Sequence, residues 1–306
     1  MNDQLLELRS LASKAENRRT ETGIPRVAMV QGQIPEHMLA AVYDPMINLI
    51  LQGSKTMTIG DRTLRYDPAT YFVMSIELPA VGTVHPAASG EPYLALSLTL
   101  DPTVLSTLLT DLSSPARNTE SDAAFSVAAT TPALMDAWLR MLRLMGRPEE
   151  IMALAPVYER EILYRVLQGP HGWMLRDIAA PDTAMARISQ AIQWIRRDFA
   201  EPIRVEALAQ KAAMSVSAFH RHFKAVTTLS PLQYQKRIRL LRARMLMVAS
   251  AKSVTNAAFE VGYESATQFS RDYARVFGLP PARDTARMRH ADTPHHPRSN
   301  RGRQWH

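Results

Sequence analysis

The sequence of 306 residues contains no cysteine. Its absence excludes disulfide bonds, thiolate zinc sites, iron–sulfur clusters, cysteine nucleophiles and repair proteins that accept alkyl groups on a cysteine. There is also no apolar run near the roughly 20 residues that a helix needs to cross a bilayer. Residues 1–21 are charged throughout and lack the apolar centre of a signal peptide. We therefore expect a cytoplasmic protein.

Histidine is scarce in the first 170 residues, where only His37 and His85 occur, far apart in the chain. A metal-dependent β-barrel enzyme needs two imidazoles and a carboxylate that converge on one ion. The sequence also has no Ser-His-Asp order, Walker loop or dinucleotide fingerprint. We therefore expect a protein that is not an enzyme and that has neither a cofactor nor a metal site.

Charge is divided unevenly along the chain. From Asp182 onward there are 21 Lys and Arg against 9 Asp and Glu, a net charge of +12, whereas residues 1–181 carry −5 and the whole chain +7. A basic domain joined to a mildly acidic one is typical of a polyanion-binding module attached to a domain with another task.

The first half of the chain has short strand-like runs between an N-terminal helix and a helical segment. Apolar spacing predicts an amphipathic helix or arm over residues 5–19. Gly60 and Asp61 mark a tight hairpin. The clearest strands are expected at residues 46–52, 56–59, 70–76, 82–85 and 93–100. Such strands, separated by Gly, Pro and Asp, predict a small antiparallel barrel or sandwich.

Helices are expected next, at residues 104–109, 132–145 and 148–167, the last two opening with a proline. One apolar stripe on the middle helix is formed by Leu134, Trp138, Met141, Leu142 and Met145. We favour a subunit or interdomain contact for this stripe, because a small barrel has little surface to cover it, with ordinary core as the alternative.

A pocket for a small ligand is the functional hypothesis for the strands. Its candidate lining residues are Tyr43, Met46, Met74, Glu77 and His85. The alternative, which carries more weight, is that these residues are core and surface polar groups.

The last third of the chain contains two similar segments at an offset of 50 residues. Phe219, Arg221 and Phe223 recur as Phe269, Arg271 and Tyr273, Ser215 recurs as Ser265, and Pro231 recurs as Pro281. Each copy has a short helix, a turn and a second helix, which is the order of a helix-turn-helix. A duplicated unit of this kind indicates a protein that binds DNA at two places.

The first unit is expected to use helices at 205–213 and from Ser217, which we predict as the N-cap, after a helix at 185–199. The second is expected to use helices at 254–260 and 266–276, with Ser265 as the N-cap and Gly262 in the turn. A helix at 231–248, with Tyr234, Ile238, Leu241 and Met245 on its buried side, is expected to hold the recognition helices about 34 Å apart. Its basic residues, expected to contact phosphates, are Lys236, Arg237, Arg239, Arg242 and Arg244.

The chain resembles the AraC family of transcriptional regulators. The resemblance rests on "MSVSAFHRHFKAVTTLSPLQYQKRIRLLRAR" from Met214 and "FEVGYESATQFSRDYARVFGLPP" from Phe259. The run "YDPMINLILQGSKTMTIGDRTLRYDPATYFVMSIELPAVG" also resembles the cupin-like N-terminal domain of one branch of that family. The implied fold is α+β: a cupin-like β-barrel with flanking helices, then an all-α domain of two helix-turn-helix units joined by a long helix.

The resemblance also implies positions for DNA contact. The base-reading positions fall on Ser217, His220, Arg221, Thr267, Ser270 and Arg271. The expected backbone contacts are Lys224, Lys236, Arg237, Gln268 and Arg275. Ala266 has no polar group with which to read a base. Ala274 occupies the position at which the first copy has Lys224, so we predict weaker phosphate contacts for the second unit.

The family typically binds direct-repeat operators as homodimers, with a small-molecule effector in the N-terminal domain. We therefore expect double-stranded DNA and RNA polymerase as partners and a nucleoid-associated location. One alternative is a constitutive DNA-binding protein whose barrel only dimerises. The least favoured alternative is a cupin-type enzyme with a DNA-targeting domain.

The expected domains are an arm at 1–22, an effector and dimerisation domain at 23–180 with a helical segment at 101–169, and a DNA-binding domain at 183–285. Within the last, the helix-turn-helix units are expected at 203–227 and 253–277, joined by a helix at 231–249. Residues 286–306 are expected to form a basic, disordered tail.

Overall fold

The computed structural model describes residues 2–16, 18–32, 38–112, 124–180 and 183–291. These residues divide into two compact units. The first contains residues 1–197 and 203–235, and the second contains residues 198–202 and 236–306. The first unit therefore holds the strands together with one helix-turn-helix, and the second unit holds the other. The predicted domain boundaries stay predictions.

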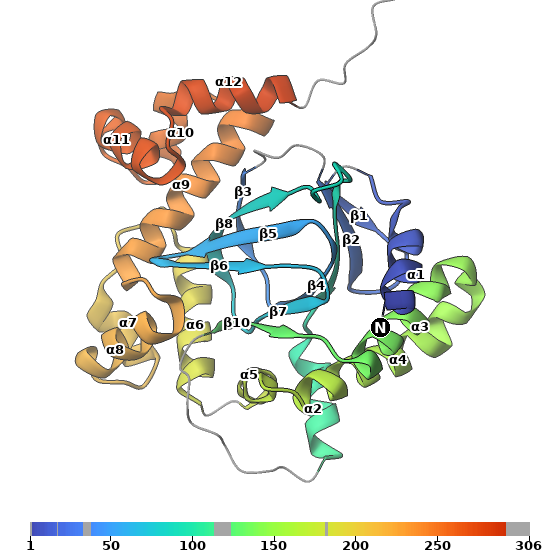
Figure 1. Cartoon of the computed structure of the whole chain (residues 1–306). Coiled ribbons are helices and arrows are strands. Elements are labelled where there is room, and N and C mark those ends of the chain that lie inside the picture. Colours follow the sequence, from blue (N-terminus) through green and yellow to red (C-terminus); the bar gives the residue numbers. More distant parts are fainter. Residues whose placement is uncertain (1, 17, 33–37, 113–123, 181–182, 292–306) are drawn as a thin grey trace, which may run out of the picture. The chain divides into compact units, whose positions relative to one another are not determined.

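The strands of the first unit form two antiparallel sheets, here called the β domain (Figure 1). The six-stranded sheet has the order β1 (Arg18–Glu21), β2 (Val27–Gly32), β9 (Tyr93–Thr99), β4 (Met46–Gln52), β7 (Thr70–Met74) and β10 (Phe125–Ala129). The four-stranded sheet has the order β3 (Met38–Tyr43), β8 (Leu78–His85), β5 (Ser54–Ile59) and β6 (Arg62–Tyr66). The two sheets face each other, since Tyr66 stacks on Phe72 with ring centroids 5.3 Å apart. The predicted β-rich fold is confirmed, as two sheets that do not close into a ring.

The N-terminal helix is shorter than expected. Helix α1 spans Asn2–Ala12 instead of residues 5–19, and β1 begins at Arg18. The backbone of residues 18–21 pairs with β2, and this pairing overrides the helical spacing of the sequence. The predicted Gly60–Asp61 hairpin is present, because Ile59 pairs with Arg62 and Gly60 has a positive φ of 59°.

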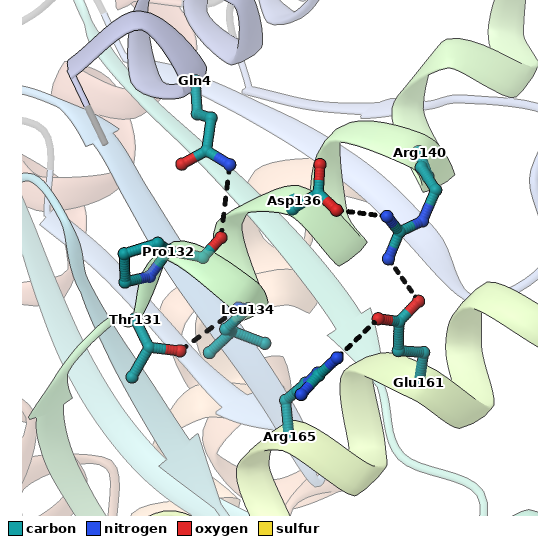
Figure 2. Close-up of polar contacts among 8 residues, drawn as sticks. All are labelled: Gln4, Thr131, Pro132, Leu134, Asp136, Arg140, Glu161 and Arg165. Atoms are coloured by element: carbon teal, nitrogen blue, oxygen red, sulfur yellow. Dashed lines mark hydrogen bonds and ion pairs between the residues drawn. The ribbon is translucent and has the colours of Figure 1, made fainter.

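Helices cover the outer face of the six-stranded sheet. They are α1, α2 (Pro102–Thr110), α3 (Pro132–Arg143), α4 (Ile151–Leu167) and α5 (Gly172–Ala179), with 3-10 turns at Leu144–Gly146 and Pro148–Glu150. Thr131 caps α3 by accepting from the backbone N–H of Leu134 at 3.2 Å, and Pro132 occupies the first turn. Figure 2 shows this cap, the bond from Gln4 of α1 to the carbonyl of Pro132, and the pairing of Arg140 on α3 with Glu161 on α4.

The apolar stripe of α3 is core, so its prediction as a subunit contact is corrected. Leu134, Trp138, Met141 and Leu142 are each at most 2% exposed, and Met145 packs against them partly buried. The physical reason is that α1 and α4 of the same chain cover the stripe, together with the outer face of the sheet. No described helix is long and apolar enough to span a membrane.

The first helix-turn-helix belongs to the first unit. It contains α6 (Ala184–Arg197), α7 (Val205–Lys211) and α8 (Val216–Thr227). Phe219 and Phe223 of α8 are fully buried, as their spacing of four predicts. The N-cap is Ser215, whose hydroxyl accepts from the N–H of Ala218 at 3.3 Å. The prediction of Ser217 as the cap was therefore wrong by two residues, because the helix begins at Val216 and Ser217 lies in its first turn.

The second unit repeats this arrangement with α10 (Val254–Glu260) and α11 (Ala266–Phe277), where Ser265 is the N-cap as predicted. Helix α9 (Pro231–Ala249) precedes them and α12 (Pro281–Ala291) follows. Met245, expected on the buried side of α9, is 59% exposed. The expected disordered tail is corrected for its first six residues, because α12 continues to Ala291; Asp284 and Thr285 anchor this helix in the core. The rest of the tail lies outside the described residues.

Candidate nucleic-acid interface

Helix α8 presents a polar row to solvent opposite its buried phenylalanines. Ser217, His220, Arg221 and Lys224 are all exposed. Their spacing of three and four residues puts them on one face of the helix. An arginine here has the geometry to donate two parallel hydrogen bonds to a guanine edge, and a lysine near the helix end suits a phosphate.

Helix α11 presents the corresponding row. Thr267, Gln268, Arg271 and Arg275 are exposed, while Phe269 and Tyr273 are fully buried. Ser270 is only partly exposed, and its hydroxyl donates to the carbonyl of Ala266 at 2.9 Å. This internal bond leaves the oxygen of Ser270 as an acceptor, so Ser270 suits a base donor better than a base acceptor.

The basic residues of α9 have different roles that the sequence did not distinguish. Arg239 donates to four backbone carbonyls, and Arg244 is buried against Asp284 with an Nε–Oδ2 distance of 2.8 Å. The prediction of phosphate contacts for these two arginines is therefore corrected: both guanidinium groups are engaged inside the unit. Arg242 is exposed.

The two backbone-contact candidates on α9 are also constrained. Lys236 pairs with Asp272 of α11 at 2.9 Å, so part of its charge is neutralised within the unit. Arg237 is partly buried, and desolvation lowers the pKa of its guanidinium. Lys224 and Arg275 are both open to solvent, although Arg275 also lies 4.0 Å from Asp272.

The first recognition helix lies beside the β5–β6 turn of the β domain. A cavity of about 330 Å³ between them is lined by Asp61, Arg62, Arg221, Lys224, Ala225 and Thr228. Thr228, just after α8, donates from its hydroxyl to the carbonyl of Ile59 at 2.9 Å. The sequence contains no signal for this contact, because it joins residues 169 positions apart. It places two candidate DNA-contacting side chains, Arg221 and Lys224, next to the β domain.

A second contact joins the β domain to the helices around α8. The Tyr234 hydroxyl donates to the carbonyl of Glu77 at 2.9 Å, and the Glu77 carboxylate pairs with Arg196 of α6. Glu77 was a candidate pocket residue, and the structure instead engages it at this junction. Its partners are helical residues that no strand pattern reveals.

The other candidate pocket residues do not converge. His85 and Thr56 are hydrogen-bonded at 3.0 Å, and both are partly exposed, on the face of the four-stranded sheet opposite the buried Met57 and Val84. Met46 accepts from the Ser97 hydroxyl at 3.6 Å through its sulfur, and Met74 is fully buried. Only Tyr43 lies beside a buried charge, that of Lys55. Sequence reasoning missed Lys55, although its place in the alternation with Met57 and Ile59 put it on the buried face.

Comparison with known proteins follows the same division of the chain. A family model described as the AraC-type transcriptional regulator N-terminus matches residues 23–174, and a helix-turn-helix domain model matches residues 208–287. The transcriptional activator RhaS of Escherichia fergusonii is 35% identical over 145 residues, 45% of this chain and 51% of that protein. RhaS of Citrobacter koseri is 37% identical over 96 residues, 31% of this chain and 34% of that protein. The chain thus spans about half the length, or less, of these curated relatives.

A solved structure with a similar fold is ToxT from Vibrio cholerae with a bound unsaturated fatty acid. It has a TM-score of 0.57 and 11% identity, covering 85% of this chain and 94% of its own. That identity shows a shared fold alone. The first family model covers β2 to β10 with α2 to α4, and the second covers most of α7 and all of α8 to α11. The long motifs around α8 and α11 lie within the second model. The chain belongs to the AraC family of transcriptional regulators.

Proposed function

We propose that this protein is a sequence-specific transcriptional regulator that reads a direct-repeat operator as a homodimer and responds to a small molecule held in the β domain. It would act with RNA polymerase in the cytoplasm, associated with the nucleoid, and perform no catalysis. The observation that carries the proposal is the matched pair of recognition helices: each exposes a polar row with one central arginine above a buried aromatic pair. A merely solvated basic helix would not need the same row twice at the same spacing.

Base reading is assigned to Ser217, His220 and Arg221 in the first unit and to Thr267, Ser270 and Arg271 in the second. Backbone contacts are assigned to Lys224, Lys236, Arg237, Gln268 and Arg275. The division follows from chemistry, since guanidinium groups in the middle of a recognition helix reach base edges, whereas groups near helix ends meet phosphates.

Replacing Arg221 or Arg271 with alanine is expected to relax specificity, each at a different base pair. Loss of a bidentate contact to guanine removes about 1–3 kcal/mol of discrimination at that pair. The measurement is binding of the purified full-length protein to a set of operator variants, each changed at a single position. The operator itself is found by selecting genomic fragments with the protein and footprinting the best one.

Lys236→Ala is the matched comparison, because it removes a charge outside the recognition helices. It is expected to weaken all operator variants alike and to reduce the salt dependence of binding by about one counterion. If Arg221→Ala also weakens every variant equally, the assignment of Arg221 to base reading is wrong.

Effector response is proposed to pass through the contact between the β5–β6 turn and α8. The contacts that join the β domain to the first unit's helices include the hydrogen bonds of Thr228 and Tyr234 and the ion pair of Arg196. A shift of the strands on ligand binding would therefore move, or release, the helix that carries Arg221. The unsaturated fatty acid bound by ToxT, which has a similar fold, supports the binding of a small molecule by a protein of this fold.

Gly60→Ala is expected to uncouple this contact. Gly60 has a φ of 59°, and a Cβ atom there would clash with the Thr228 hydroxyl oxygen, so the turn or the Thr228 side chain must shift and we expect the Thr228–Ile59 hydrogen bond to be lost. Because the turn lies beside Arg221 and Lys224, its release is expected to raise operator affinity severalfold, a coupling of about 1 kcal/mol.

Gly90→Ala is the control for the backbone strain of the first variant. Gly90 has a φ of 85°, but nothing lies within 4 Å of the position of its Cβ atom. Operator affinity of the ligand-free proteins is measured by fluorescence anisotropy. Equal affinities for the two variants would mean that the β5–β6 turn does not restrain the first recognition helix.

A further inference from the structure

A buried lysine occupies the space between the two sheets of the β domain. Lys55 lies on β5 in alternation with Met57 and Ile59, which are fully buried, and Lys55 itself is 5% exposed. Neighbouring Thr56 and Thr58 face the other way and are partly exposed. The ammonium group of Lys55 is therefore directed inward, toward the six-stranded sheet.

This ammonium has no counter-charge among the described residues. No carboxylate pairs with its Nζ atom there, and a close group is the ring of Tyr43, with the Nζ 5.0 Å from the ring centroid. A cation–π contact offsets only part of the cost of burying a charge. Removal from water accordingly lowers the pKa of Lys55 to about 8.

Tyr66 and Tyr93 are buried in the same interior, close enough to Tyr43 to interact with it electrostatically. Tyr66 lies directly opposite Lys55 on β6, is 1% exposed, and its hydroxyl has no hydrogen-bond partner. Tyr93 of β9 approaches from the other sheet, and its hydroxyl reaches the side-chain oxygen of Asn48 only at 3.5 Å. Burial raises the pKa of Tyr43, Tyr66 and Tyr93 above the usual value, and repulsion from neighbouring tyrosines adds to the increase for Tyr66 and Tyr93, so all three remain neutral hydroxyls.

The cluster thus holds a buried donor without a hydrogen-bond partner, the Tyr66 hydroxyl, next to a buried lysine that pairs with no carboxylate among the described residues. In folded proteins such donors are almost always satisfied by protein, water or a ligand. We propose that Lys55, with the Tyr66 hydroxyl, binds the carboxylate of an organic acid whose apolar body lies among the side chains between the sheets. This assignment rests on the proposed function, because it names the chemical class of its effector.

The composition of the site favours a carboxylate over a phosphate. It offers a single positive charge, whereas phosphate sites combine arginine forks, several cations or helix N-termini. The walls near the charge are apolar and aromatic: Met57 and Ile59 follow Lys55 along β5, and Phe72 stacks on Tyr66. A monoanion with an apolar body matches one cation in an apolar surrounding.

The test uses the full-length protein with butanoate, octanoate and benzoate, each beside its uncharged amide, and with inorganic phosphate. Binding is measured by calorimetry at pH 7. At least one carboxylate is expected to bind tenfold or more tightly than its amide, and phosphate is expected not to bind. In Lys55→Met, which keeps the length of the side chain, the preference is expected to fall below twofold. Lys14→Met removes an exposed lysine and is expected to change nothing.

Two further readouts separate recognition of the charge from a change of fold. In Tyr66→Phe, which loses only an unpartnered hydroxyl, carboxylate affinity is expected to fall severalfold while the amides are unaffected. In the wild-type protein, carboxylate affinity is expected to fall about tenfold between pH 7 and pH 9, because Lys55 loses its proton near pH 8. The other titratable groups facing the site, the three tyrosines, stay neutral over that range.

The proposal is overturned if no carboxylate is preferred to its amide, or if the preference survives in Lys55→Met. Operator binding of the ligand-free protein is measured on the same samples. Operator recognition without carboxylate preference would overturn the anion site and leave the proposed regulator intact. Carboxylate preference without any DNA sequence preference would support the anion site and overturn the proposed regulator.

Discussion

Replacing Asp284 with alanine is expected to lower the free energy of unfolding of the second unit by about 3–5 kcal/mol, because it leaves a buried arginine without its partner. The Asp284 side chain is fully buried and that of Arg244 is 6% exposed, with Nε–Oδ2 at 2.8 Å. Asp284 Oδ2 also accepts from the Tyr273 hydroxyl at 2.8 Å. One carboxylate therefore ties α9, α11 and α12 together, and the Arg244 guanidinium has no route to water after the substitution.

Urea denaturation of the full-length protein, followed by circular dichroism, measures this loss. Arg287→Ala is the matched control, because Arg287 pairs with the same carboxylate at 3.5 Å but is 48% exposed. Exposed pairs contribute little, so this variant is expected to cost less than about 1 kcal/mol. Equal costs for the two variants would show that the Arg244–Asp284 pair is not the buried anchor described above. Operator binding is expected to weaken in Asp284→Ala, because α11 loses its support.

Arg239→Ala is expected to destabilise the second unit by about 3 kcal/mol and to leave the salt dependence of DNA binding unchanged. The guanidinium donates to the carbonyls of Phe199, Ala200, Glu201 and Gly262, at 2.7 to 3.1 Å. Each charged hydrogen bond contributes about 1.5–3 kcal/mol where the acceptor is otherwise unsatisfied, and water replaces some of them at the exposed end. These bonds hold residues 198–202 within the second unit and fix the turn at Gly262.

Arg242→Ala is the comparison, three residues further along α9. Arg242 is exposed and lies near the ring of Phe199, with 5.9 Å between its guanidinium carbon and the ring centroid. We expect this variant to reduce the slope of the logarithm of the DNA-binding constant against the logarithm of the salt concentration by about one. The free energy of unfolding is expected to change by less than about 0.5 kcal/mol. If Arg239→Ala instead changes the salt dependence of DNA binding and Arg242→Ala changes stability, Arg239 contacts phosphates and the role given to it here is wrong.

Most of the helices and the paired recognition elements could be predicted from local sequence. Residues 46–52 form β4 and residues 254–260 form α10, as expected. Strong periodicity, proline at the first turn and serine caps act within a few residues, so they can be recognised from the sequence alone. Strands β1, β2, β3, β6 and β10 were not predicted. The pairings of β2, β3 and β10 with β9, β8 and β7 join residues distant in sequence, and β1 and β6 are short strands whose character depends on packing more than on local sequence.

Part of the candidate DNA interface could also be predicted from local sequence, and part could not. The exposed rows of α8 and α11 follow from helical spacing around Phe219 and Phe269, since a buried aromatic residue fixes which face is left for DNA. The roles of the α9 arginines did not follow, because Arg239, Arg242 and Arg244 have the same local sequence character and differ only in what packs against them. The Trp138 stripe was misassigned for the same reason: its apolar spacing predicts burial but does not name the covering element.

The sequence by itself determined that this protein is a β domain followed by two helix-turn-helix units, and which side chains each recognition helix exposes. Those features depend on periodicity, capping and repetition, which act over a few residues. Only the tertiary structure decided that α1 and α4 cover Trp138, that Arg244 is buried against Asp284, that the β5–β6 turn reaches α8, and that Lys55 is enclosed without a counter-charge. Each of these features depends on packing between segments far apart in the chain. The free energy of a charged group or an aromatic ring depends more on whether it is buried than on the residues next to it in sequence.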